Sequence, residues 1–193
     1  KHPYIVGFGL SGDEERYSQK LFQLAFIILK DAGIHRTIHA GEAVGPKSVW
    51  EAISILHAER IDHGTRAIED DNLVSFLAEK RIPLTQCLTS NVKLNVVPNY
   101  SSHPFGKLFS RGLVISLNTD DPAIFETDLN EEYLLAAEYF QLSINDLCKL
   151  ASNSVDSSFL QDDEKIILKN QFEKEINQIK HELNIQKNQG DKQ

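Results

Sequence analysis

The 193-residue sequence contains no methionine and only two cysteines, Cys87 and Cys148. Two isolated cysteines form neither a disulfide framework nor a CxxC metal motif, so we expect a reducing, cytoplasmic setting. The longest apolar run, near Leu24 to Leu29, is far shorter than the roughly 20 residues of a membrane-spanning helix. The first residues, Lys1-His2-Pro3, do not resemble a signal peptide. These absences argue against a secreted or membrane-embedded protein.

Basic residues are also scarce: 20 Lys and Arg face 28 Asp and Glu, for a formal net charge of −8. An acidic chain makes a poor general binder of nucleic acid, which needs clustered Lys and Arg. Hydrophobic residues make up 41%, which is typical of a globular domain. The chain has no initiator methionine and reads as a buried strand from Tyr4 onward. We therefore expect a piece cut from inside a larger domain.

Short apolar runs alternate with amphipathic stretches, which is the pattern of parallel βαβ units. One amphipathic stretch has an apolar face of Tyr17, Leu21, Leu24 and Ile28 and stops at Gly33. After residue 160 the sequence turns polar and helix-forming, so we divide the chain into a barrel portion (1–160) and a C-terminal helix with a polar tail (161–193). The expected strands are Tyr4–Leu10, Arg36–His39, Arg60–His63, Ile82–Cys87 and Leu113–Asn118.

Two α/β architectures fit this alternation: an open doubly wound sheet and a closed (β/α)8 TIM barrel. His39, His63 and Cys87 recur at intervals of 24 residues, which indicates a regular repeat. All five strands also end in chemically capable residues. A barrel builds its active site from the ends of several strands, whereas an open sheet needs such groups only at its switch point. The pattern favours the barrel, with this chain covering about strands 4 to 8.

The segment Gly7 to Gly12 reads GFGLSG, a literal match to the GxGxxG dinucleotide-binding fingerprint. It would make the protein a nucleotide-dependent oxidoreductase. However, Asp13 and Glu14 follow at once, where two carboxylates would repel a pyrophosphate. We therefore interpret these glycines as a tight turn at a strand end.

The remaining strand ends carry the groups of a metal-dependent hydrolase. His39 lies three residues before Glu42, His63 ends the next strand, and Asp120 and Asp121 follow the last one. Imidazole and carboxylate suit zinc, and a nearby carboxyl group can transfer protons. The set therefore predicts a site that activates water on a metal.

Each of these residues also has a structural interpretation when taken alone. A single histidine near a strand end is more often structural, and Asp-Asp-Pro can be a simple helix-entry turn. Ser90-Asn91 can be a loop, and Cys87 is best explained as a small buried residue. The other histidines, His103 among them, have no supporting pattern. The argument for a site rests on the whole set at successive strand ends.

Five motifs follow one another along the chain: Leu10–Glu14 (LSGDE), His39–Glu42 (HAGE), Arg60–Gly64 (RIDHG), Thr89–Asn91 (TSN) and Asn118–Pro122 (NTDDP). In this order and spacing, they resemble the motifs of the adenosine deaminase family. The resemblance runs from about Val6 to the Ser157–Leu160 segment.

The resemblance implies a zinc-dependent (β/α)8 barrel that deaminates a small 6-aminopurine. By that resemblance, His39 and Asp120 are zinc ligands, and Ser90 supports Asp120. Glu42 protonates the purine ring at N1, and His63 orients or deprotonates the attacking water. For the substrate, the resemblance implies that the Gly12 backbone meets N3 and that Asp121 hydrogen-bonds N7. The PCxxC element that cytidine deaminases combine with HxE is absent from the sequence.

Two departures from the family pattern bear on activity. The family takes two further zinc ligands from an HxH motif, and none occurs among the seven histidines here. Gly9 also stands where family members usually have Asp. We therefore expect a deaminase in the parent protein and an incomplete metal site in this chain, with a catalytically inactive purine-binding module as the alternative.

The substrate is less sharply defined than the reaction. The family includes adenosine, adenine and aminodeoxyfutalosine deaminases. Asp62 before His63 is more typical of adenine deaminases, whereas the segment Leu117–Asp121 looks more like the adenosine branch. We place adenosine first and adenine second.

Overall fold

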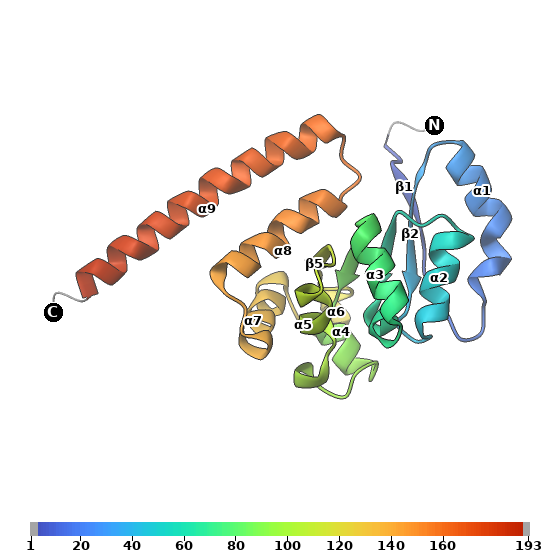
Figure 1. The fold of residues 1–193 in the computed structure, drawn as a ribbon, viewed down its shortest axis with the longest axis horizontal. Helices are drawn as coiled ribbons and strands as arrows, with labels where there is room; N and C mark the ends of the chain where they lie inside the picture. The colour runs from blue at the N-terminus through green and yellow to red at the C-terminus, as the bar shows by residue number, and fades with distance from the viewer. Residues whose placement is uncertain (1–3, 191–193) are drawn as a thin grey trace.

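The computed structural model describes residues 4–190, with side chains described through residue 182. At its centre lies one parallel five-stranded sheet. The strands stand side by side in chain order (Figure 1). They are β1 (Gly7–Leu10), β2 (His35–Ala40), β3 (Arg60–His63), β4 (Leu84–Gln86) and β5 (Ile115–Leu117).

The strand order confirms the expected α/β architecture and decides between its two forms. A doubly wound sheet reverses its strand order at a switch point, but this sheet runs β1-β2-β3-β4-β5 without reversal. Such a sequence of neighbours is one continuous part of a barrel wall. All five expected strands are present, although β1, β4 and β5 are shorter than the apolar runs that predicted them.

Helices and short 3-10 turns connect the strands. Between strands lie η1 (Gln19–Phe22), α1 (Gln23–Asp31), α2 (Pro46–Ser54), η2 (Thr65–Glu69), α3 (Asp71–Lys80), α4 (Leu88–Lys93), η3 (Tyr100–Ser102) and α5 (Phe105–Ser110). After β5 come α6 (Pro122–Phe125), α7 (Leu129–Phe140), α8 (Ile144–Ser157) and α9 (Asp162–Gly190).

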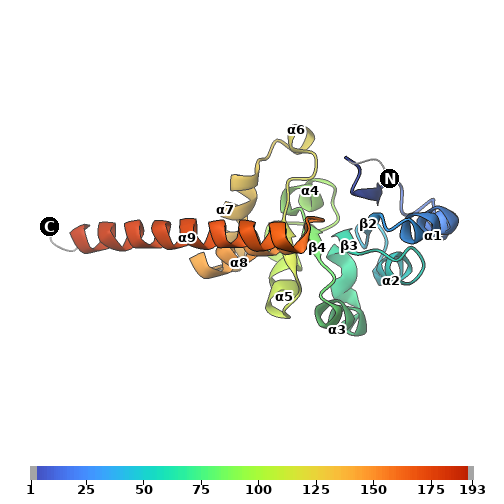
Figure 2. The same ribbon diagram turned by 90° about the horizontal axis from the view of Figure 1, so that it is seen from above.

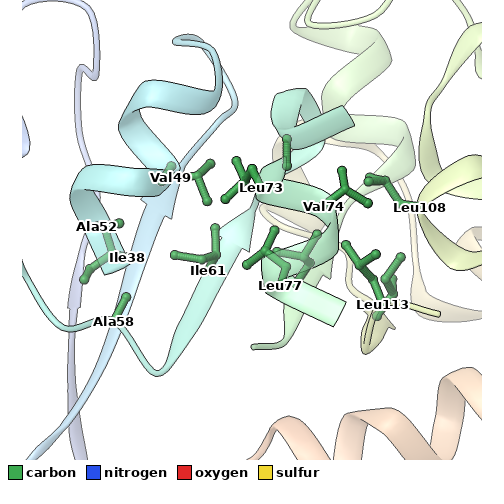
Figure 3. Close-up of a cluster of buried hydrophobic side chains, with 14 of the residues drawn as sticks. Ile38, Val49, Ala52, Ala58, Ile61, Leu73, Val74, Leu77, Leu108 and Leu113 are labelled. Carbon is green, nitrogen blue, oxygen red and sulfur yellow. The ribbon is translucent and has the colours of Figure 1, made fainter. Parts of the chain in front are cut away.

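The pleat of the strands separates an apolar layer from a polar one. Ile38, Ile61, Leu84 and Ile115 pair successively across β2 to β5 and are fully buried. Figure 3 shows part of this core, where side chains such as Ile61 meet helix residues such as Leu77. Because successive strand residues point to opposite faces, the neighbouring positions carry a polar row, with Asp62 paired to His39 and Thr85.

Helix α1 does not bury the apolar face that its sequence spacing predicts. Leu21, Leu24 and Ile28 are 69%, 78% and 67% exposed, and Phe26 is the buried residue. The helix packs on β2, and β1 is the edge of the sheet, so among the described residues no further strand or helix covers that face. The spacing thus predicts the helix correctly, and most of the apolar face that it identifies is exposed.

The structure corrects the interpretation of the Gly7–Gly12 glycines as a tight turn, because Gly7 and Gly9 lie within β1 and only Gly12 follows the strand. The Asp13 side chain accepts hydrogen bonds from the Glu15 and Arg16 amides at 3.1 and 3.0 Å. The next helical turn, η1, begins only at Gln19. Within residues 4–190, no helix therefore begins directly after the Gly7–Gly12 motif, whereas a pyrophosphate site requires a helix N-terminus there.

Helix α9 packs against α8 and then extends away from the sheet (Figures 1 and 2). Lys180 donates a hydrogen bond to Asn145 at 2.6 Å, near the start of α8. The helix continues through Gly190, and the last residues of the expected polar tail, 191–193, lie outside the described residues. The division of the chain at residue 160 stays a prediction. None of the helices in residues 4–190 has the length and apolarity needed to cross a membrane.

Candidate metal centre and active site

Three potential metal ligands converge at the carboxyl end of the sheet. His39 lies near the end of β2, His63 ends β3, and Asp120 follows β5 by three residues. Their ligand atoms all lie within 4.8 Å of one another. His63 Nε2 is 3.9 Å from Asp120 Oδ2, and the two imidazole rings are 5.0 Å apart between centroids. The parallel strands thus bring together residues that are far apart in sequence.

The backbone at two of these residues departs from ordinary strand geometry. His63 and Asp120 have φ values of +64° and +57°, in the left-handed region that non-glycine residues rarely adopt. Strand alternation from Ile61 would place His63 on the apolar face, yet its ring lies beside that of His39. Such conformations cost about 1–3 kcal/mol each and cluster at functional sites.

The donor set fits a zinc ion. Two imidazoles and a carboxylate are ligands of the type that zinc prefers. His39 Nδ1 is buried and has no hydrogen-bond partner, although Asp62 Oδ2 lies 3.5 Å away outside hydrogen-bonding geometry. A buried imidazole nitrogen without a partner is unusual and costly. The three residues line one cleft of about 600 Å³, which leaves room for further ligands and a substrate.

Glu42 stands beside this cluster in an environment that favours its protonated form. Its Oε1 lies 3.3 Å from His63 Nδ1. Burial is the main cause that raises the pKa of Glu42 to about 7, with the charges of Asp120 and Glu14 adding to it and the Asn91 hydrogen bond opposing it. A carboxyl group with this pKa can donate or accept a proton near neutrality.

His63 is held in the complementary state. Burial lowers the pKa of His63, and the neighbouring His39 lowers it further, while Asp120 and Asp62 act in the opposite direction. The imidazole is therefore neutral at pH 7 and has a nitrogen free to accept a proton or bind a metal. The pair combines a carboxyl group that gains and loses its proton near neutrality with a neutral imidazole.

Asn91 connects these groups, which the sequence alone did not reveal. The fully buried Asn91 donates to Glu42 Oε1 at 3.2 Å and lies 3.3 Å from His63 Nδ1. Its Oδ1 accepts from the Thr65 hydroxyl at 2.6 Å and interacts with His103 Nε2 at 3.1 Å. His103 therefore supports Asn91. The Ser90-Asn91 pair after a strand is the sequence signal that points to Asn91.

Asp62 is a second residue to which sequence reasoning assigned no role in the site. Its Oδ1 accepts from the hydroxyls of Thr37 at 2.7 Å and Thr85 at 3.1 Å. Its Oδ2 faces His39 Nδ1. The carboxylate is therefore fixed by both neighbouring strands and faces a candidate ligand. The alternation of polar residues at paired strand positions could have identified it.

The structure brings some predicted residues to the cluster and leaves others apart. The Ser90 hydroxyl donates to Asp120 Oδ2 at 2.6 Å. Gly12, with φ of +144°, lines a separate cavity of about 90 Å³ that His39 also borders. Asp121 is exposed and is not among the residues that line the large cleft. Cys87 is buried, as expected.

Comparisons with known proteins show which family the chain resembles. A family model described as "Adenosine deaminase" matches residues 1–175. The adenosine deaminase of Salmonella schwarzengrund is 44% identical over 165 residues, which cover 86% of this chain and 50% of that protein. The adenosine deaminase of Yersinia pseudotuberculosis is 40% identical, with 86% and 49% covered. The chain thus spans about half the length of the curated relatives it matches.

Solved structures show the same fold. An adenine deaminase from Arthrobacter aurescens is 33% identical with a TM-score of 0.85, covering 89% of this chain and 53% of that one. A Burkholderia ambifaria amidohydrolase with bound Zn is 29% identical with a TM-score of 0.87, covering 93% and 50%. The N6-methyl-AMP deaminase of Arabidopsis thaliana is 31% identical with a TM-score of 0.78, covering 88% and 49%.

Proposed function

The chain belongs to the adenosine deaminase family, and from that premise we propose that its protein hydrolytically deaminates a 6-aminopurine with a zinc cofactor. The observation that carries the proposal is the cluster of His39, His63 and Asp120, with Glu42 3.3 Å from His63. Adenosine, converted to inosine and ammonia, is the first candidate substrate because the curated relatives at 40–44% identity are adenosine deaminases.

His39 and Asp120 are the residues that would hold the zinc, with His63 next to them. When bound, zinc supplies Lewis-acid chemistry that makes water nucleophilic near neutral pH. The Ser90 hydroxyl, which donates to Asp120, would orient that ligand. The Asp62 carboxylate, which faces His39, would orient the other. The chain offers two of the four protein ligands that the family pattern implies, because the sequence contains no HxH motif.

The proton transfers follow from the two titrating side chains. His63, neutral at pH 7, accepts the proton that water loses when its oxygen attacks the carbon bearing the amino group. Glu42 delivers its proton to ring atom N1, which relieves the negative charge that builds up on the purine. His63 then returns its proton to the amino group, which leaves as ammonia, and Glu42 takes up the hydroxyl proton as the carbonyl group of the product forms. Gly12 and Asp121 are proposed to contact the purine at N3 and N7, which requires substrate to reach both the small cavity and the exposed Asp121.

The proposal is tested by deamination assays on the full-length protein with adenosine, adenine and N6-methyl-AMP in parallel. Glu42→Gln should nearly abolish turnover while bound zinc stays stoichiometric by elemental analysis. Glu79→Gln, at an exposed carboxylate on α3, is the matched control and should retain both. Near-normal turnover in Glu42→Gln would remove Glu42 from its proposed role. Preferred turnover of adenine would favour the adenine deaminase alternative, and an aminodeoxyfutalosine assay covers the third.

A catalytically inactive purine-binding module is the second candidate, because only two of the expected zinc ligands are present in this sequence. The two functions differ in their metal content. A deaminase carries stoichiometric zinc in the full-length protein, whereas an inactive module binds purine without it. For both candidate functions we propose a cytoplasmic protein, since Cys87 and Cys148 are free thiols, the usual state of cysteine in a reducing compartment.

A further inference from the structure

One carboxylate, that of Glu14, binds four consecutive backbone amides. Its Oε1 accepts from Gly41 N–H at 2.9 Å, and its Oε2 accepts from the amides of Glu42, Ala43 and Val44 at 3.2, 2.8 and 3.0 Å. Successive amides that point at one anion form a backbone nest. Hydrogen bonds to an ionised acceptor are about twice as strong as neutral ones. The contact joins the turn after β1 to the segment after β2.

The segment 41–45 has no regular secondary structure of its own, so other groups must hold it. Gly41 has φ of +70° and ends the extended backbone of β2. On the carbonyl side, the Arg66 amide donates to Gly41 O and the Arg66 guanidinium to Ala43 O, both at 2.7 Å. On the amide side, Glu14 is the partner of all four residues, with Ser48 sharing Gly41 N–H at 2.8 Å.

Among the four amides that donate to Glu14, only Gly41 N–H has a second hydrogen-bond partner in the described residues, the Ser48 hydroxyl. The amides of Glu42, Ala43 and Val44 precede Pro46, where α2 begins, so they are not the free amides of that helix. Without Glu14, the amides of residues 42–44 would have to hydrogen-bond to water instead. Glu42 lies in the middle of this segment, so loss of the clamp would loosen the residue whose carboxyl group meets His63.

We propose that Glu14 is a positioning residue that clamps the segment 41–44 and thereby aims Glu42 at the reacting purine. This inference rests on the proposed deaminase function. Glu14 acts through the backbone of another residue, so its effect falls on the rate of the chemical step. Misplacing a reacting group by about 1 Å can cost about a hundredfold in rate.

The clamp itself is tested by amide hydrogen exchange, which needs no activity. Glu14→Gln is neutral and keeps only one oxygen acceptor, because an NH2 donor replaces the other, so its hydrogen bonds to the amides of 42–44 should be weaker. We expect hydrogen exchange of these amides to become about tenfold faster. Glu15→Gln is the matched control: Glu15 is exposed, and its carboxylate accepts none of the four bonds. Unchanged exchange in Glu14→Gln overturns the proposal.

Kinetics of the full-length protein separate positioning from a general loss of structure. In Glu14→Gln, kcat should fall about a hundredfold with KM for adenosine within about threefold of wild type. Glu14→Ala opens space next to the cavity lined by Leu10, Tyr17 and Phe22. Acetate should restore part of its kcat, whereas acetamide, of similar shape but uncharged, should not. Equal loss of kcat in Glu15→Gln, or rescue by both additives, overturns the proposal.

The proposed deaminase function and the positioning role of Glu14 can be refuted separately. A wild-type protein that turns over no aminopurine refutes the proposed function, and hydrogen exchange still supports or refutes the Glu14 clamp. An active wild type with unaffected Glu14 variants refutes the positioning role and leaves the proposed function intact.

Discussion

The burial of Glu42 should make the stability of the protein depend on pH in a way that one substitution removes. The folded state raises the pKa of Glu42 from 4.5 to about 7, chiefly through burial. Between pH 4.5 and 7, folded Glu42 holds a proton that the unfolded chain has released. The free energy of unfolding therefore falls as pH rises through this window. The stabilising contribution of protonated Glu42 is complete below pH 4.5 and is lost once the pH exceeds its pKa in the folded state, about 7.

The magnitude follows from the same values. Each pKa unit corresponds to 1.36 kcal/mol, so the rise amounts to about 3 kcal/mol. The Glu42 side chain is only 18% exposed, so solvent screening reduces this figure modestly. Against a typical total stability of about 5–15 kcal/mol, the effect is large. It should move the urea midpoint by about 1 M across the window.

The assay is urea unfolding of the chelator-treated protein at several pH values between 4 and 8. Glu42→Gln cannot titrate, so its stability should rise relative to wild type as pH increases, and the difference isolates Glu42 from other titrating groups. Glu79→Gln controls for the change in charge. If wild type and Glu42→Gln lose stability in parallel from pH 4.5 to 7, the assigned environment of Glu42 is wrong.

Four further substitutions test the surrounding framework. Asn91→Ala removes the contacts to Glu42, Thr65 and His103 and should lower the free energy of unfolding by about 2–4 kcal/mol in urea. Thr65→Val removes one of these contacts and should cost about 1 kcal/mol. Equal losses in the two variants would contradict the role of Asn91 in connecting these groups. Ser90→Ala should weaken zinc binding by about 10–100-fold in a competitive chelator titration, and unaltered affinity would refute its support of the metal site. The fully buried Glu132 accepts the Leu88 amide at 2.8 Å, so Glu132→Ala should lower the free energy of unfolding by about 3 kcal/mol, and a loss below 1 kcal/mol would show that water replaces it.

Much of the architecture could be read from local pattern. The expected strand Arg60–His63 matches the structure because it is a short segment between turns with an apolar residue, Ile61, at a buried position. The position of His39, His63 and Asp120 at strand ends follows from the same rule, since parallel strands end at one edge. The alternation of strand and helix then limited the fold to two candidates.

Local pattern does not identify the partners of a side chain. Periodicity reports that one face of α1 is apolar and does not identify what covers it. Asp121 is exposed at the start of α6, outside the residues that line the large cleft, so its contact with the purine stays a prediction.

The sequence by itself determined the parallel strand–helix repeat and the chemistry available at each strand end, because both depend on residue type and short-range spacing. Only the tertiary structure decided which groups meet. Asn91 links Glu42, His63, Thr65 and His103, and Glu14 binds the amides of residues 41–44. These partners lie 12 to 49 residues away from Asn91 and 27 to 30 away from Glu14. Contacts over such separations depend on how the strands and turns pack, which no local pattern encodes.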